Sequence, residues 1–433
     1  MLDLDFFKKS VLLWAGNLSF SFLGVIVFFL LVNTLGPEHY GNYSLVLSIV
    51  AMISLAFYGI IGESIIRFSY EDKDKVLYHG LKLQLIFGVI SFLVLFLFAD
   101  KIAGIYNKQI ADIIRVVSFS FLITPFIEAI KSYGIGLKNV KLFVLLSVIF
   151  QLGMIVSLLL AFRVGKTGFF AAFAFLTANI ITFLFTLKNI RFSYFLSRKR
   201  SRVLLRMNKY IKNGFFYGLT RNLYFQSPLI VGGYFVDSVS LAFYSFGLSL
   251  GTQGLFTFIT SIQTMLLPYV VSIKNKKKMS EYISAVIKIG IVVTITLSLA
   301  ILVLVYFLLP LLFPKYMESF KYIPWIFLAF VFLNLRAPMA LFKVAERTDI
   351  LTKISIFTAL TSIVIGLLMS FLFGLVGMII ALNISVLLSS YLHIHYLKRI
   401  NNIKVSLLIS WRDWVIFRKY LAIFIKSFKK KFF

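Results

Sequence analysis

Long apolar segments alternate with short charged gaps along almost the whole chain. A helix needs about 20 apolar residues to cross the hydrocarbon core of a membrane, and runs of this kind recur throughout the sequence. The pattern predicts an all-α polytopic membrane protein with about twelve transmembrane helices. The expected spans are 10–33, 42–62, 80–99, 112–131, 142–162, 168–187, 213–234, 241–270, 283–309, 322–343, 351–371 and 374–393.

The gaps between these spans form two alternating sets that differ in charge. With the N-terminus placed in the cytoplasm and charges near a span end counted with the adjoining side, 36 of the 45 Lys and Arg residues fall on the inner side and 7 on the outer side. The remaining 2, Arg221 and Arg336, fall within spans. Cytoplasmic loops carry an excess of Lys and Arg, so this bias predicts an even number of spans and two cytoplasmic termini. The net charge of +29 thus reflects membrane topology and predicts no nucleic-acid partner.

The longest inner gap divides the spans into two sets of six. Residues 188–212 carry nine Lys and Arg residues and predict a basic cytoplasmic linker between an N-lobe, 1–187, and a C-lobe, 213–393. Segments 43–49 and 244–250 resemble each other and occupy equivalent places in the second and eighth spans. This repeat favours two pseudo-symmetric lobes that run in parallel through the membrane.

The tail, residues 394–433, alternates Lys and Arg with Trp, Phe and Tyr and has no apolar run long enough to span. We expect a basic amphipathic helix on the cytoplasmic leaflet, with anionic inner-leaflet lipids as its partner. A disordered polybasic tail is the alternative.

Arg221 is the sharpest candidate for chemistry because it falls about two turns into the seventh span. Helical spacing puts Tyr217, Arg221 and Tyr224 on one face, with Asn222 and Gln226 on the neighbouring face. A polar sector this broad is unfavourable against lipid, so it predicts a wet cavity. The alternative is an arginine whose side chain reaches back to the cytoplasmic headgroups.

Other intramembrane charges are few, and each is costly, on the order of 2.5–3.5 kcal/mol. Arg336 lies deep in the tenth span. Glu128 lies in the fourth span, where Lys131, one turn further on, provides an ion-pair partner. Arg67 ends the second span, either as a cavity residue or as an interfacial anchor paired with Glu63.

Signatures of enzymes and cofactor sites are missing. The chain has no Cys, which excludes disulfides, thiol catalysis and Cys-ligated metals. His393 and His395 are two residues apart on a predicted helix and do not converge on one metal ion. The outer gaps are only about ten residues long, too short for an active-site domain. The sequence predicts a transporter without a cofactor or a metal.

Three short motifs carry a resemblance to a known family. Residues 35–44, Leu-Gly-Pro-Glu-His-Tyr-Gly-Asn-Tyr-Ser, resemble the first outer loop of Wzx-type polysaccharide flippases in the MOP transporter superfamily. Residues 64–68 resemble the end of their second span, and residues 266–270 the Leu-Pro-rich close of their eighth. Together with the spacing of the spans, the resemblance covers about 390 residues.

The resemblance implies a V-shaped pair of six-helix lobes around a cationic central cavity that opens alternately to either side. The implied substrate is an undecaprenyl-diphosphate-linked oligosaccharide, moved from the inner to the outer leaflet during assembly of O-antigen, capsule or another lipopolysaccharide-type glycan. The implied location is the bacterial cytoplasmic (inner) membrane, with a glycan polymerase and a chain-length regulator as possible partners.

Within that family role, the candidate residues divide by chemistry. Arginine suits phosphate because its planar fork binds two oxygens at once. We assign the diphosphate to Arg221 and Arg336, the inner entrance to Arg67, sugar contacts to the amide and aromatic side chains, and proton coupling to Glu128. The amide and aromatic candidates are Asn17, Asn222, Gln226, Tyr217 and Tyr224.

Two other functions remain as alternatives. A multidrug exporter of the same superfamily commonly carries a cation-binding carboxylate in its first helix, whereas residues 10–33 contain no charge. An Arg-lined cavity also repels organic cations. A membrane-embedded glycan polymerase or ligase needs a substantial outer loop, which the short outer gaps do not provide.

Overall fold

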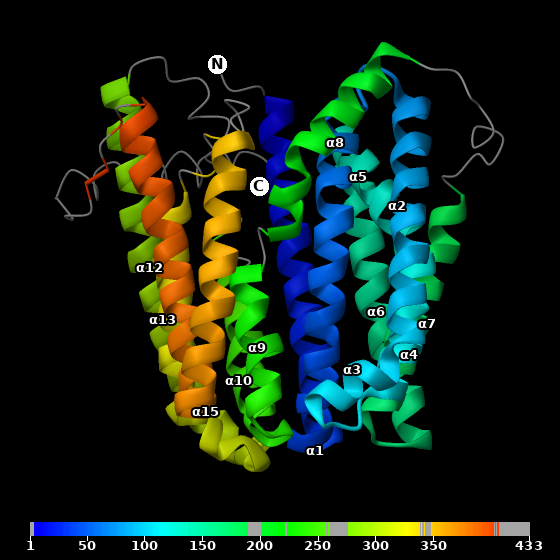
Figure 1. Ribbon diagram of the computed structural model, residues 1–433, viewed down its shortest axis with the longest axis vertical. Helices are drawn as coiled ribbons and strands as arrows, with labels where there is room; N and C mark the ends of the chain where they lie inside the picture. Colours follow the sequence, from blue (N-terminus) through cyan, green and yellow to red (C-terminus); the bar gives the residue numbers. More distant parts are fainter. Residues whose placement is uncertain are drawn as a thin grey trace, which may run out of the picture.

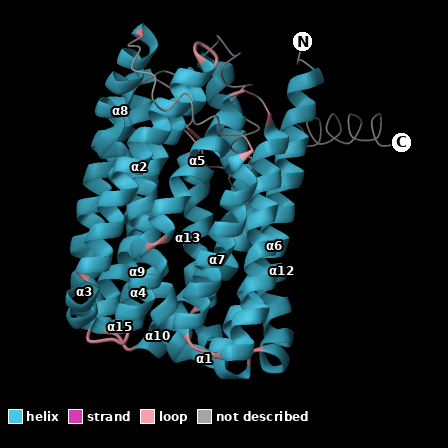
Figure 2. Cartoon of the chain, turned by 90° about the vertical axis from the view of Figure 1, so that its right-hand side faces the viewer, coloured by secondary structure: helices cyan, strands magenta, loops and turns pink. Residues whose placement is uncertain are grey.

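The protein is almost entirely helical, as predicted. The computed structural model describes residues 4–137, 139–188, 201–220, 223–256, 259, 276–337, 339, 342, 348–401, 403 and 405–406, and it has no strand among them. Figure 2 shows the helices running roughly side by side, with most connecting loops at the two ends of the bundle. The all-α fold class is confirmed.

The first and last helices are each too long to cross a membrane once. Helix α1 (Leu4–Phe68) has 65 residues, and at 1.5 Å per residue a straight helix of that length would measure about 98 Å against a hydrocarbon core of about 30 Å. Its backbone leaves helical geometry at Gly36, whose φ of 70° is one that other residues rarely adopt. Figure 1 shows α1 running down the molecule and returning.

Helix α15 (Thr348–Asn401) repeats this solution. It bends at Gly374, where φ is 54° and ψ is −127°. Residues 34–41, expected as a loop, therefore contain only one non-helical position, because Pro37 provides a ready start for the returning helix. At its other end α15 continues to Asn401, eight residues beyond the predicted end of the last span.

The rest of the N-lobe follows the predicted spans. The elements are α2 (Lys73–Leu97), α3 (Ala99–Tyr106), α4 (Ala111–Ser118), α5 (Ser120–Gly136), α6 (Val140–Val164) and α7 (Gly168–Leu187). Helices α4 and α5 together cover the fourth span but are bent by 44° with respect to each other.

The C-lobe is more broken. Its elements are α8 (Arg202–Thr220), α9 (Leu223–Phe235), α10 (Ser238–Gly251), the π-helix η2 (Thr252–Phe256), α12 (Lys276–Leu312), the 3₁₀ helix η3 (Pro314–Lys321), α13 (Ile323–Leu333) and the 3₁₀ turn η4 (Asn334–Arg336). Helix α8 begins within the predicted linker, so residues 202–212 are helical.

The described residues hold six helices long and apolar enough to cross a membrane, or eight if each of two bent pairs counts as one span. Two of the six are the doubled helices α1 and α15. Parts of the predicted seventh and eighth spans lie outside the described residues. The total of twelve spans remains a prediction.

The two lobes meet at one end of the bundle and diverge toward the other (Figure 1). At the meeting end, the Ser238 hydroxyl of α10 donates to Asn42 Oδ1 of α1 at 2.6 Å, and the Tyr40 and Ser249 hydroxyls lie 3.1 Å apart. A Cβ on Gly41 would lie 1.8 Å from the Ser238 carbonyl oxygen, so only glycine permits this approach. We call this region, including the loop between α3 and α4, the closed end.

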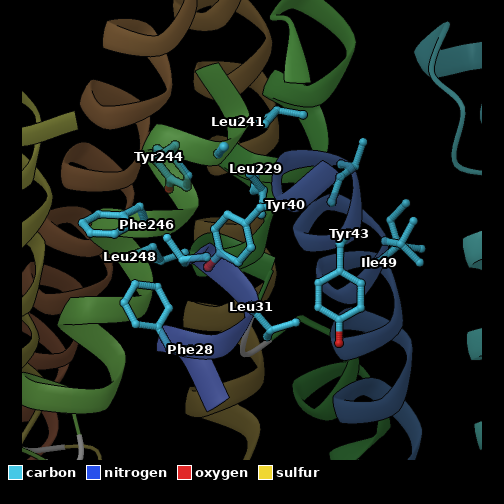
Figure 3. Packing of buried hydrophobic residues seen from close by; sticks show 14 of the residues in the cluster. Phe28, Leu31, Tyr40, Tyr43, Ile49, Leu229, Leu241, Tyr244, Phe246 and Leu248 are labelled. Carbon is cyan, nitrogen blue, oxygen red and sulfur yellow. The ribbon is translucent and has the colours of Figure 1, made fainter. Parts of the chain in front are cut away.

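Next to these polar contacts, the lobes pack through aromatic and aliphatic side chains. The Phe28 ring of α1 lies 5.2 Å from the Phe246 ring of α10, centroid to centroid, and Tyr40 lies beside Leu248 (Figure 3). The predicted repeat contributes directly to this core, because Tyr43 and Tyr244 are both fully buried in it.

The opposite end, where α1 begins and Phe68 is followed by α2, we call the basic end. There α8 packs against the N-lobe although it begins the C-lobe. Met207 is buried with Ile60 and Ile61, and Arg206 Nη1 lies 2.7 Å from a Glu71 carboxylate oxygen. On its other side α8 contacts α15, so this helix joins the lobes at the basic end.

The orientation of the two ends can be read by cysteine labelling, because the natural chain contains no Cys. Met317 of η3 at the closed end is 48% exposed, and Tyr70 at the basic end is 56% exposed. We expect a membrane-impermeant maleimide to label Met317→Cys in intact cells and Tyr70→Cys only after permeabilisation, since the positive side faces the cytoplasm. The reverse pattern would contradict the predicted orientation.

Candidate functional site

Arg336 is held in place by a polar anchor inside the C-lobe. It ends the 3₁₀ turn η4 that follows α13. Two residues earlier, Asn334 Nδ2 donates to the Thr294 hydroxyl of α12 at 2.9 Å, and Gly290 of α12 leaves room for the Asn334 side chain. A 3₁₀ turn within a longer helix often marks a functional position. Here it fixes where the guanidinium projects.

The Arg336 guanidinium rests on the ring of Tyr224, the second residue of α9. Its Cζ lies 4.5 Å from the ring centroid, and its Nη1 donates to the Tyr224 hydroxyl. Its Nη2 lies 3.7 Å from the Met339 sulfur. The Nε atom is buried, and no described residue accepts a hydrogen bond from it. Arginine commonly makes such cation–π contacts in proteins.

Tyr217 joins the same group through Met339. Its hydroxyl lies 4.0 Å from the Met339 sulfur. Tyr217 and Tyr224 are only 2% and 5% exposed, so these rings are packed against protein and do not line open water, contrary to the expectation of a wet face. Tyr224 contacts Arg336 directly, whereas Tyr217 reaches only Met339, and the shared face predicted for both tyrosines with Arg221 stays a prediction.

Three predicted site residues are not placed by the structure. Arg221 and Asn222 lie outside the described residues, between α8 and α9. Asn17 belongs to α1, but its side chain is likewise outside the described part. Gln226 of α9 is half-buried, one helical turn beyond Asn222 in sequence. The roles assigned to these four residues stay predictions.

The N-lobe candidates lie apart from this group along the chain and in different packing environments. The Glu128 carboxylate of α5 pairs with Lys131 Nζ at 3.2 Å, which confirms the ion pair expected from their spacing. The Arg67 guanidinium at the basic end lies 5.7 Å from the Phe68 ring and 5.3 Å from the Tyr210 ring of α8. Arg67 is exposed, as an entrance or anchor residue would be.

Two buried groups in the C-lobe were not predicted. His393 of α15 is 1% exposed; its Nδ1 lies 2.7 Å from the Ser389 carbonyl oxygen, and the charge of Arg336 acts on its ring. Lys288 of α12 is 5% exposed, although its place near the start of the span expected at 283–309 puts it among the inner-side charges. His395, by contrast, is exposed, so the two histidines face different surroundings. Nothing in the sequence near His393 signals its proximity to Arg336.

The arrangement can bind an anion. Arg336 is partly exposed and carries a full charge within a helix that the hydropathy pattern assigns to the membrane. Such a charge is unfavourable in hydrocarbon unless it meets water, a counter-ion or polar groups. Tyr224 and Met339 supply an acceptor and a polarizable sulfur but no negative charge. The group is therefore suited to an incoming phosphate or carboxylate.

Comparison with known proteins fits these features. A family model described as polysaccharide biosynthesis protein matches residues 6–274, more than half of the chain. No curated protein matches the chain significantly. The match covers the whole N-lobe and the start of the C-lobe, including both segments of the predicted repeat.

Solved structures share the whole fold at low sequence identity. An inward-facing multidrug resistance MATE family transporter of the MOP superfamily superposes with a TM-score of 0.70 at 16% identity, over 88% of this chain and 95% of that one. The lipid II flippase MurJ in an inward closed conformation gives 0.68 at 14%, over 99% and 92%. A MOP superfamily transporter from Pyrococcus furiosus gives 0.66 at 16%, over 93% and 97%.

The resemblance noted in the sequence is thereby confirmed for the family and for the helical fold. The apolar helices and the shared fold identify a multi-pass membrane protein. The chain belongs to the polysaccharide biosynthesis protein family and has the fold of the MOP superfamily transporters.

Proposed function

We propose that the protein is a flippase that moves undecaprenyl-diphosphate-linked oligosaccharides from the inner to the outer leaflet of the bacterial cytoplasmic membrane. The lobes alternate between opening at the basic end and opening at the closed end. The isoprenoid chain stays in lipid throughout, whereas the diphosphate and the sugars pass between the lobes. Glycan polymerase and chain-length regulator would act on the product.

The observation that carries this proposal is the Arg336 group. A guanidinium with a buried, unpartnered Nε and no acidic contact among the described residues is prepared for an anionic ligand. A planar guanidinium binds phosphate oxygens in pairs, and loss of hydration inside the protein strengthens that contact. Arg221 would supply a second positive charge from the neighbouring stretch of the chain.

Two findings support the lipid-linked substrate class. The family match assigns the chain to polysaccharide biosynthesis, and one relative in fold is a lipid II flippase, itself named for a lipid substrate. Residues 10–33 contain no acidic residue, and their span forms the first half of α1. An exporter of organic cations would need a negative group where this helix has none.

The first test is transport in proteoliposomes with a labelled undecaprenyl-diphosphate oligosaccharide, followed by a glycosidase that reaches only the outer leaflet. We expect the joint replacement Arg221→Ala and Arg336→Ala to slow flipping about 10- to 100-fold, because a hydrogen bond to a charged group contributes about 1.5–3 kcal/mol.

Arg163→Ala is the matched control, since Arg163 is an exposed arginine in the last turn of α6. It should flip substrate at the wild-type rate. An unchanged rate in the double variant would remove the diphosphate role from both arginines. Elongation of the lipid-linked glycan by the purified protein would instead indicate a polymerase or ligase.

A second test separates the charge of Arg336 from its orientation. Tyr224→Phe keeps the ring under the guanidinium but removes the hydroxyl that accepts from Nη1. The lost hydrogen bond contributes about 1 kcal/mol to holding the guanidinium in place, so we expect flipping to slow about five-fold. Tyr234→Phe, an exposed tyrosine on the same helix, is the control. Equal rates in the two variants would show that the hydroxyl does not orient a functional arginine.

A third test concerns the driving force. An inside-negative potential pushes an anionic headgroup outward by about 2.3 kcal/mol per charge per 100 mV if it crosses the whole field. We therefore expect a potassium diffusion potential to accelerate flipping in the outward direction. The alternative is coupling to protons through Glu128. It would be indicated by a flipping rate that does not change with the potential, increases with a proton gradient and is lost in Glu128→Gln.

A further inference from the structure

Lys108 joins the two lobes at the closed end. It belongs to the N-lobe loop that follows α3, where Asn107 adopts a left-handed conformation with φ of 49°. Its ammonium group lies 2.7 Å from the Gly233 carbonyl oxygen and 2.8 Å from the Val236 carbonyl oxygen in the C-lobe. A longer contact of 3.4 Å reaches the Tyr106 carbonyl oxygen in its own lobe.

The acceptors are the carbonyl groups of Gly233, in the last turn of α9, and of Val236, the residue that follows this helix. The last carbonyls of a helix have no partner within it, and the partial negative charge there favours a cation. Gly233 also lets the N-lobe approach, because a Cβ at this position would lie 2.8 Å from Leu45 and 3.3 Å from Tyr106. The loop thus reaches across to cap a helix of the opposite lobe.

Asp237, the acidic residue near Lys108, also makes a hydrogen bond within the C-lobe. Asp237 follows Val236 and caps α10 by accepting from the Ser240 backbone N–H at 3.2 Å. Burial lowers the pKa of Lys108, and the negative charge of Asp237 raises it in opposition. The ammonium group is therefore held mainly by neutral carbonyl oxygens in partial burial, and hydration by water would compensate it for part of these bonds on release.

The rest of the closed end joins the lobes by few polar contacts among the described residues. The Ser238 hydroxyl donates to Asn42 Oδ1, and the Tyr40 and Ser249 hydroxyls lie 3.1 Å apart. Both are bonds between neutral groups, which contribute less than a bond to a charged group. Lys108 supplies the charged donor.

From these observations we infer that Lys108 is a releasable clasp that holds the closed end shut by capping α9 from the opposite lobe. The charge-assisted bonds to Gly233 and Val236 link the N-lobe to the C-lobe in the closed state. Release of the ammonium group into water removes that link and so favours separation of the lobes at this end. The clasp sets the balance between closed and open states and is independent of the substrate.

The test is a distance measurement between spin labels across the closed end, in the protein without substrate. Ile105 of α3 and Met317 of η3 are 60% and 48% exposed, and both accept labels as Ile105→Cys and Met317→Cys in a chain with no other Cys. We expect Lys108→Met to raise the ratio of long to short distances about ten-fold, as loss of one charge-assisted hydrogen bond implies.

Lys101→Met is the matched control, because Lys101 of α3 lies over the Phe98 ring of its own lobe at 5.3 Å. It should leave the distance distribution unchanged, and Lys108→Arg should restore much of the closed population. A Lys108→Met protein that is less heat-stable but has the wild-type distance distribution would overturn the proposal, since it would show a static cap. If Lys108→Met fails to fold, Lys108→Gln gives the same comparison.

Discussion

The hydrocarbon core of the membrane is the constraint on which the rest of this structure depends. Backbone groups in lipid must be bonded within the protein, so every segment described there is helical. Most charge lies toward the two ends, and helices too long for one crossing must turn back. Gly36 and Gly374 make those turns at a break in helical geometry, because the backbone angles there suit glycine. The few charges that stay inside need water, a ligand or a charged partner, as Glu128 has in Lys131.

The two repeat segments lie on the helices that pack against each other where the lobes meet. Segments 43–49 and 244–250 are similar in sequence, and their helices pack against each other where the lobes meet. Glycine at position 41 and small hydroxyl residues in α10 allow a close approach there, with two side-chain hydrogen bonds. At the other end α8 contacts both lobes. The contacts at the closed end are close but few, which is consistent with the proposed alternation of the lobes.

Hydropathy and charge were enough to predict the class of fold, most spans and the Glu128–Lys131 pair, because these follow from local sequence. The ends of helices were predicted poorly where a helix continues into a segment rich in charged residues. Helix α8 begins at Arg202, within the predicted linker, because its apolar face packs on the N-lobe. His393 and the reach of Lys108 to α9 depend on tertiary contacts between distant segments and leave no local pattern. The contact between Tyr224 and Arg336 joins two distant segments, and the burial of Tyr217 and Tyr224 depends on neighbouring helices, so neither follows from local spacing.

The central claim is that an intramembrane arginine receives the anionic headgroup of a lipid-linked glycan. The most direct measurement is a structure of the protein in a lipid nanodisc with bound undecaprenyl-diphosphate oligosaccharide. The account predicts diphosphate oxygens about 3 Å from the Arg336 guanidinium, with Nε among the donors. A diphosphate bound elsewhere, with Arg336 still resting on Tyr224 and its Nε unpartnered, would contradict it.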